Sequence, residues 1–190
     1  MQTEPAVRRA RELVGAGVLG DPVHAHGTNS QRVLEMIPDP DQWRLDPDLT
    51  GYGTSVMDLG TYPINTARFL LDHDPVAAEA WMRSSHDAFA DVPNERAAFT
   101  LTFEDDLPLV VTTSQNAQTD AQLTITGTDG RVELRPAFHG TATLRVARGD
   151  VSAEITTGYD GRHGLADLRT IRAIHEAAER GEVVDVADGL

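Results

Sequence analysis

The sequence has no cysteine and no lysine, and all 16 of its basic residues are arginine. Without cysteine, the chain has neither disulfide bonds nor thiolate metal ligands. It also lacks any run of about 18 apolar residues, and its first residues are charged, so it predicts neither a membrane-spanning helix nor a signal peptide. These absences favour a folded, cytoplasmic protein.

A second absence concerns nucleotide binding. No G-x-G-x-x-G follows a strand pattern, no P-loop occurs, and no phosphate cradle can be assembled from the 16 glycines. We therefore expect the chain to contain no nucleotide-binding domain of its own.

The charge is strongly one-sided, with 30 acidic residues against 16 basic ones and a net charge of -14. Nucleic acids and anionic membranes need basic contacts to phosphate, so neither is expected as a partner. A dense carboxylate surface without lysine is typical of proteins in high salt, where charges are screened within about 3 Å at 1 M. We expect a halophilic archaeal source. A high-GC genome would explain the missing lysine but not the acid excess.

The pattern of apolar residues predicts an α+β fold. Helical spacing indicates a helix from Pro5 to the glycines at 15–17, one within 50–71, and one within 164–181. Alternation indicates strands at 21–33, 76–86, 95–104, 108–115, 120–127, 130–135, 141–147 and 151–157. Sequential strands with short connections indicate an antiparallel meander. We expect one two-layer domain in which helices cover one face of the sheet.

The helix within 50–71 carries an acid and a phenol, Asp58 and Tyr62, four positions apart. Residues i and i+4 of a helix project to the same side. Gly51 and Gly53 would let the backbone approach a bound molecule closely, and Gly60 would leave room beside the pair. The alternative is a buried helix in which the acid and the phenol simply satisfy one another.

Several motifs around this pair form a longer pattern: Q-W-R-L at 42–45, M-D-L-G-x-Y at 57–62, R-F-L-L at 68–71 and I-T-G-T-D-G at 125–130. Together they resemble the C-terminal domain of the glucose-fructose oxidoreductase (Gfo/Idh/MocA) family. The resemblance spans nearly the whole chain, and it is strongest with sugar 1-dehydrogenases of the D-xylose or glucose-fructose type. It implies a mostly antiparallel, open-faced sheet with helices on one face.

The resemblance also implies a function. Residues 1–190 would form the substrate-binding and oligomerisation domain of an NAD- or NADP-dependent sugar dehydrogenase. The Rossmann domain and its E-K-P lysine would precede Met1, so we expect an excised or truncated part that is inactive alone and binds no nucleotide. A stand-alone binding or scaffold domain of the same fold is the alternative.

Roles for the acid and the phenol follow from the resemblance. Tyr62 would accept the proton of the sugar hydroxyl together with the absent lysine, and Asp58 would orient the substrate or that lysine. A phenol has an unperturbed pKa of about 10, so it needs a nearby cation to act at neutral pH. A carboxylate beside Tyr62 would only raise the pKa of the phenol further, which fits a binding role for Asp58.

Three further residues are candidates for substrate binding. Trp43 and Arg44 could stack on a sugar ring and hydrogen-bond its hydroxyls, or they could anchor their loop to the domain. Asn65 lies one turn beyond Tyr62 and could reach the pocket or belong to the polar face of the helix. Pro63 removes a helical hydrogen bond and should kink the helix just after Tyr62.

Two last expectations concern metals and self-association. His24 and His26 would share a strand face, but two ligands without a suitably spaced third do not make a metal site, and none is expected. The stretch 108–115 has apolar residues on both alternations. A sheet covered on one face only would then expose a large apolar patch, so we expect a homo-oligomer through the open face.

Overall fold

The computed structural model describes residues 4–138 and 142–156. By internal contacts the chain divides into two compact units, residues 1–157 and 158–190. The described residues all belong to the first unit. The helix expected within 164–181 lies outside them.

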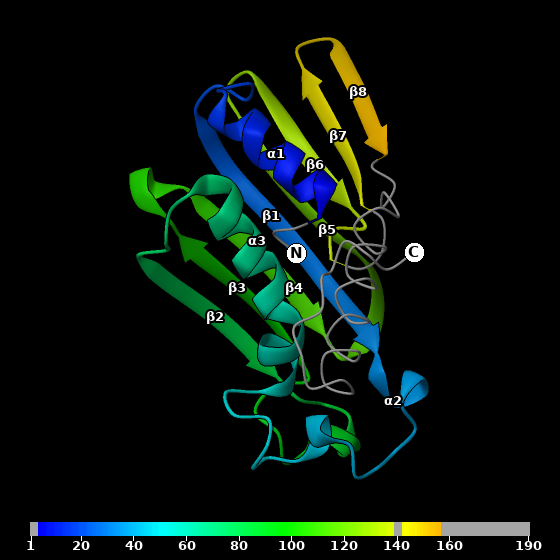
Figure 1. Cartoon of the computed structure of the whole chain (residues 1–190). Helices are drawn as coiled ribbons and strands as arrows, with labels where there is room; N and C mark the ends of the chain where they lie inside the picture. Colours follow the sequence, from blue (N-terminus) through cyan, green and yellow to red (C-terminus); the bar gives the residue numbers. More distant parts are fainter. Residues whose placement is uncertain (1–3, 139–141, 157–190) are drawn as a thin grey trace, which may run out of the picture. The chain divides into compact units, whose positions relative to one another are not determined.

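The first unit is built on one eight-stranded sheet with the order β2-β3-β4-β1-β5-β6-β7-β8 (Figure 1). The strands are β1 (Pro22–Arg32), β2 (Ala77–Arg83), β3 (Arg96–Thr102), β4 (Pro108–Ser114), β5 (Asn116–Gly127), β6 (Gly130–Arg135), β7 (Thr143–Arg148) and β8 (Val151–Thr156). All eight strands were predicted within a few residues of their ends. The mostly antiparallel, open-faced sheet is confirmed.

The strand order departs from a meander at one place. β1 lies between β4 and β5, parallel to β4 with Ala25 opposite Leu109, and antiparallel to β5 with Ala25 opposite Ile125. The expectation of a simple meander is therefore wrong for the centre of the sheet. Pairing between strands far apart in the chain is decided by the shared core, which a local pattern does not contain.

Two helices cover one face of this sheet (Figure 1). α1 (Pro5–Gly15) begins as predicted with proline in its first turn, and the Glu4 carboxylate accepts a hydrogen bond from the Val7 N–H at 2.9 Å. α3 (Thr61–Leu71) contacts α1, β1 and β5. The shorter α2 (Val33–Met36) follows β1 directly. No helix in the described ranges is long and apolar enough to cross a bilayer.

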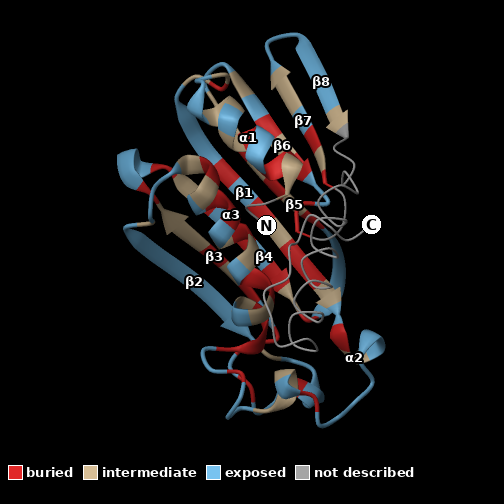
Figure 2. Cartoon of the chain, viewed as in Figure 1, coloured by how far each residue is buried: buried red, intermediate tan, exposed pale blue. Residues whose placement is uncertain are grey.

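The core lies between the helices and the sheet (Figure 2). Alternate residues of the central strands, such as Leu109, Val111, Leu123 and Ile125, are fully buried there. This alternation is what a sheet with one covered face requires.

The opposite face of the sheet is less apolar than expected. Along β4, the burial pattern sends Leu109 and Val111 to the core, and leaves Val110 and Thr112 on the open side. Trp81 of β2 is 51% exposed and Val110 is 42% exposed, with threonines between them. The open face thus carries scattered apolar residues in a polar setting, which is the ordinary composition of a non-obligate interface.

Candidate active site

The segment that carries Asp58 and Tyr62 is an irregular helix. A π-helical turn, Val56–Gly60, precedes α3, and Pro63 sits in the first turn of α3. Proline has no N–H to offer to the carbonyl four residues earlier, which is that of Leu59. The Asn29 Nδ2 of β1 donates to this carbonyl at 3.1 Å instead. The irregularity therefore precedes Tyr62, and the expected kink after it is wrong, because the proline ring acts on the turn before it.

Asp58 is held by three side chains from distant parts of the chain. Arg44 Nε donates to Asp58 Oδ2 at 2.6 Å, and Arg44 Nη2 reaches Oδ1 at 3.3 Å. Gln31 Nε2 and Gln115 Nε2 donate to the same Oδ2 at 3.0 and 2.8 Å. The Arg44 and Asp58 side chains are only 17% and 14% exposed. Charge-assisted hydrogen bonds in such a protected place fix the carboxylate firmly.

No sequence motif pointed to the two glutamines. Gln31 lies near the end of β1 and Gln115 directly after β4, and the parallel pairing places Ser30 opposite Ser114, so the two glutamines lie side by side. Gln31 Nε2 also donates to Gln115 Oε1 at 2.8 Å. Their partnership with Asp58 would have followed from the strand order, had the β1–β4 pairing been recognised.

Trp43 and Arg44 belong to a short 3₁₀ turn before the helix, Trp43–Leu45. The Arg44 guanidinium lies over the Trp43 ring, 4.6 Å from the ring centroid, and the Nε of the same guanidinium binds Asp58. Trp43 remains 38% exposed. The ion pair between Arg44 and Asp58 thus connects the 3₁₀ turn to the helix. The partly exposed Trp43 ring lies beside this ion pair.

Tyr62 is half-buried, and its ring lies 6.1 Å from that of Phe138, centroid to centroid. Gly60 faces inward, because a Cβ on it would lie 3.4 Å from the core ring of Phe99. The glycine therefore serves the packing of the π-helical turn on the sheet, and not an opening beside Asp58 and Tyr62 as expected.

Asn65 is exposed on the outer side of α3. It lines a cavity of about 410 Å³ together with Arg11, Arg68 and Asp72 from the far ends of α1 and α3. Neither Asp58 nor Tyr62 lines this cavity. The structure thus places Arg44 against Asp58 and Trp43 against Arg44. Asn65 lies beside a different cavity.

Gly53, before the helix, serves a contact inside the protein, whereas a Cβ on Gly51 would meet nothing within 4 Å. Gly53 has a positive φ of 123°, and a Cβ on it would lie 1.7 Å from Asn94 Nδ2. Asn94 is fully buried, and its Oδ1 accepts from the N–H groups of Ser55 and Val56 at 2.9 and 3.1 Å. Its Nδ2 donates to the Tyr52 carbonyl at 3.1 Å. Asn94 thus caps the helix from a different loop, and the close approach at Gly53 is to this side chain.

A cavity whose wall is partly polar and partly apolar lies next to Gln31 of the Asp58 network. It measures about 360 Å³ and opens where bulges interrupt the ladder between β1 and β5. Its wall includes Asn29, Gln31, Thr119 and Asp120. Gln31 therefore joins this cavity to the Asp58 carboxylate.

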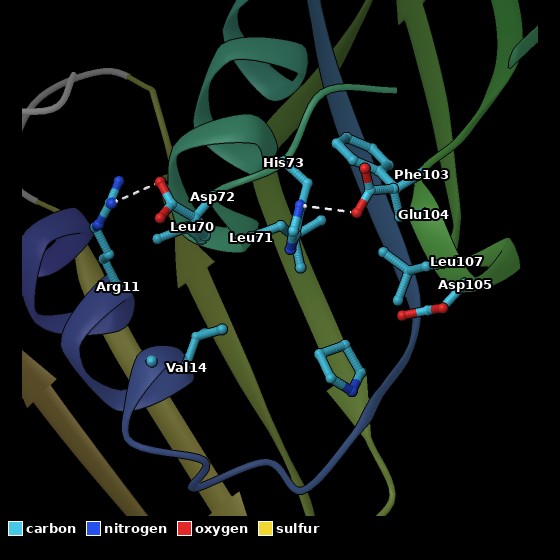
Figure 3. Close-up of a pocket in the computed structure, with 12 residues that line it drawn as sticks. Arg11, Val14, Leu70, Leu71, Asp72, His73, Phe103, Glu104, Asp105 and Leu107 are labelled. Atoms are coloured by element: carbon cyan, nitrogen blue, oxygen red, sulfur yellow. Dashed lines mark hydrogen bonds and ion pairs between the residues drawn. The ribbon is translucent and has the colours of Figure 1, made fainter. Parts of the chain in front are cut away.

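A further cavity of about 380 Å³ lies at the C-terminal ends of α1 and α3, and it shares Arg11 and Asp72 with the cavity beside Asn65 (Figure 3). Two ion pairs flank it, one between Arg11 and Asp72 at 2.7 Å and one between His73 and Glu104 at 3.3 Å. The rest of its wall is largely apolar, including Leu70 and Phe103. It shares no residue with the Asp58 network.

Two patterns could indicate a cofactor or metal site among the described residues: a glycine-rich turn and a cluster of metal-ligating side chains. Gly15, Gly17 and Gly20 do show the letters G-x-G-x-x-G, but they lie between α1 and β1, the reverse of the strand–turn–helix order that binds dinucleotides. No group of three or more metal-ligating side chains occurs in residues 4–138 and 142–156. His24 and His26 lie on the same face of β1, opposite Thr126 and Thr124 of β5, as expected for their spacing.

Residues 7–133 match the family model described as the GFO/IDH/MocA C-terminal domain. The chain belongs to this family. It is 42% identical to the D-xylose 1-dehydrogenase [NADP(+)] of Haloarcula marismortui, over 97% of this chain and 58% of that protein. A D-xylose 1-dehydrogenase (NADP(+)) of Haloferax volcanii is 29% identical over 96% of this chain and 61% of its own length. The expected similarity to sugar dehydrogenases is confirmed.

The solved structures agree. The aldose-aldose oxidoreductase of Caulobacter crescentus, crystallised with glycerol, superposes with a TM-score of 0.74 at 26% identity, and the match covers 97% of this chain and 61% of that one. This chain therefore spans about three fifths of the length of the relatives that it matches.

Proposed function

We propose that this chain is the substrate-binding domain of an NAD- or NADP-dependent dehydrogenase that oxidises a hydroxyl group of a sugar. The similarity to two haloarchaeal D-xylose 1-dehydrogenases over nearly the whole chain supports this assignment. The observation that carries it is the Asp58 carboxylate, which Arg44, Gln31 and Gln115 hold in place and which Gln31 connects to a cavity of about 360 Å³. A fixed acceptor beside a cavity lined by amides and hydroxyls suits a ligand rich in hydroxyl groups.

The nicotinamide would supply the hydride acceptor when bound. The described residues contain no strand–glycine turn–helix unit for its pyrophosphate, so the cofactor would be held by a Rossmann domain outside the described part of the chain. On this proposal the present chain alone binds no nucleotide and does not turn over substrate.

Tyr62 is the proposed proton acceptor. Oxidation of a C–OH group requires loss of the hydroxyl proton, and a half-buried phenol one turn beyond Asp58 is suited to take it. The chain has no lysine, so the lysine that would assist this proton transfer would come from outside it. Asp58 would bind a hydroxyl of the sugar or orient that cation. Trp43 would stack on the sugar ring.

Three properties of the whole protein belong to the same proposal. It would work in the cytoplasm, at high salt concentration, because a net charge of -14 is tolerated best where charges are screened. It would bind neither nucleic acid nor membrane. It would form a homo-oligomer through the open face of the sheet, with Trp81 and Val110 as apolar contacts in a largely polar interface.

Tyr62→Phe in the full-length dehydrogenase tests the proposal. The ring and its contact with Phe138 remain while the hydroxyl is lost, so kcat should fall about 10²- to 10⁴-fold with a smaller change in KM. Tyr52→Phe is the matched control, because Tyr52 is 87% exposed and should keep its activity. Steady-state rates for D-xylose and other aldoses give both constants. A Tyr62→Phe enzyme with wild-type kcat across the pH range would favour a binding or scaffold domain.

A further inference from the structure

The two oxygens of the Asp58 carboxylate have unequal surroundings. Oδ2 accepts three hydrogen bonds, from Arg44 Nε at 2.6 Å, Gln115 Nε2 at 2.8 Å and Gln31 Nε2 at 3.0 Å. Within residues 4–138 and 142–156, Oδ1 accepts one hydrogen bond, from Arg44 Nη2 at 3.3 Å. A carboxylate oxygen has about two lone pairs, so Oδ2 is saturated and Oδ1 has an acceptor site to spare.

The donors to Oδ2 are themselves fixed. Gln115 is fully buried, its N–H donates to the Glu95 carbonyl at 2.8 Å, and its carbonyl accepts from the Val33 N–H at 2.9 Å. Its side-chain Nε2 also lies 3.2 and 3.3 Å from the two oxygens of Thr54. Gln31 divides its two N–H groups between Asp58 and Gln115. Hydrogen bonds therefore fix the orientation of both glutamine side chains.

From this asymmetry, and resting on the function proposed above, we propose that Asp58 works through Oδ1 alone, and that Gln115 and Gln31 are positioning residues that aim it. Gln115 is too deeply buried to touch a substrate, so any effect it has must pass through Asp58. The ligand of Oδ1 is an O–H or N–H donor. A sugar hydroxyl and the ammonium of a lysine outside this chain are its two possible sources.

Asp58→Asn distinguishes the two sources. The three donors around Oδ2 would repel the NH₂ of an asparagine, so its carbonyl oxygen takes the Oδ2 place and its NH₂ the Oδ1 place. The three bonds to the Oδ2 place survive, the weaker bond from Arg44 Nη2 to the Oδ1 place is lost, and the free acceptor becomes a donor. If the ligand is a sugar hydroxyl, KM rises more than kcat falls. If the ligand is an ammonium, kcat falls and KM changes little.

Changes at the glutamines test the positioning role in the full-length dehydrogenase. Gln115→Met and Gln31→Met each remove one bond to Oδ2, and kcat/KM should fall about 10- to 100-fold, since small misplacements of a reacting group have costs of this order. Gln115→Glu places a second carboxylate against Asp58. Two acids in contact raise the pKa of one of them, so the acidic limb of the pH–rate profile should move up by about one pH unit.

Gln122→Glu is the matched control. Gln122 is half-buried on the open face of β5 and bonds only Thr124 and Glu133, so the same added charge there should leave the pH–rate profile unchanged. Melting temperature and oligomeric size are measured for every variant. In an Asp58→Asn background, Gln115→Met should add little further loss, whereas a merely structural role predicts that the two losses multiply.

The outcomes separate this inference from the proposed function. If Asp58→Asn impairs the enzyme while the Gln115 and Gln31 variants behave like Gln122→Glu, the positioning role is wrong and the function stands. If Gln115→Met and Asp58→Asn lower the rate independently, the positioning role is also wrong. If neither Asp58→Asn nor Tyr62→Phe affects the reaction, the proposed function itself is overturned.

Discussion

Asn94 is the residue whose replacement should destabilise the candidate site most directly. Its side chain caps the N–H groups of Ser55 and Val56 and donates to the Tyr52 carbonyl, and it is fully buried. In Asn94→Ala, Ser55 keeps its second bond to the Asn94 carbonyl at 3.2 Å, so Val56 is the N–H left without a partner. The helix that carries Asp58 would begin without its cap.

The magnitude follows from these bonds. Loss of a helix cap costs about 0.5–2 kcal/mol, and a buried N–H without a partner costs about 1–3 kcal/mol. Loss of the hydrogen bond from Asn94 to the Tyr52 carbonyl adds little to this cost, because Tyr52 is exposed and water can donate to the carbonyl instead. Both figures describe the same lost bond, so we expect a free energy of unfolding lowered by about 2 kcal/mol, which corresponds to a melting temperature about 4–8 °C lower in a domain of this size.

Thermal melts of the 190-residue chain in molar KCl, followed by circular dichroism, measure this loss. Asn65→Ala removes the same side chain from an exposed position of α3 and should stay within about 0.5 kcal/mol of the parent. A double-mutant cycle with Gly53→Ala adds a second check. The Cβ at residue 53 clashes with Asn94 Nδ2, so in the Asn94→Ala background only the strain of a positive φ remains. An Asn94→Ala loss as small as that of Asn65→Ala, or additive losses in the cycle, would refute the capping role.

Two further predictions concern pH and salt. Burial alone would raise the pKa of Glu95, but hydrogen bonds from the backbone N–H groups of His86 and Ser85 and from the Asn116 and Ser85 side chains outweigh it and hold the pKa below its ordinary value. A lowered pKa stabilises the fold above the unfolded-state value of about 4.3, and the contribution is lost as the pH falls further. The difference in melting temperature between the parent and Glu95→Gln should therefore shrink from about pH 6 to about pH 3, and a constant difference would contradict it. The melting temperature of the parent should rise steadily with KCl, because 14 excess negative charges repel one another in dilute buffer, and a flat response would contradict adaptation to salt.

The helices and strands could be predicted because their signals are local. Pro5 and the glycines at 15–17 mark the two ends of α1, and the turns around 105 and 128 separate strands with regular alternation. The resemblance to the family rested on contiguous motifs as well. Each of these patterns lies within a few residues, so tertiary structure did not have to be known.

The partners of Asp58 could not be predicted for the opposite reason. Gln31 and Gln115 meet only because β1 runs parallel to β4, and the sequence patterns of the two strands do not state that pairing. Pro63 was expected to kink the helix just after Tyr62, and the Asn29 side chain that binds the Leu59 carbonyl could not be foreseen because it comes from a distant strand. Side-chain contacts between distant elements decide the details of the site, and they depend on the assembled sheet.

The position of β1 has a consequence for the order in which the chain folds. β2 to β4 and β5 to β8 each form a ribbon of antiparallel neighbours, and β1 alone joins the two ribbons. β1 precedes both of its partners, β4 and β5, in the chain, so it must wait for them during synthesis. Contacts between such distant residues form slowly, and until they form the edges of β4 and β5 are open to other chains. Assembly of the nascent protein thus depends on one strand of eleven residues.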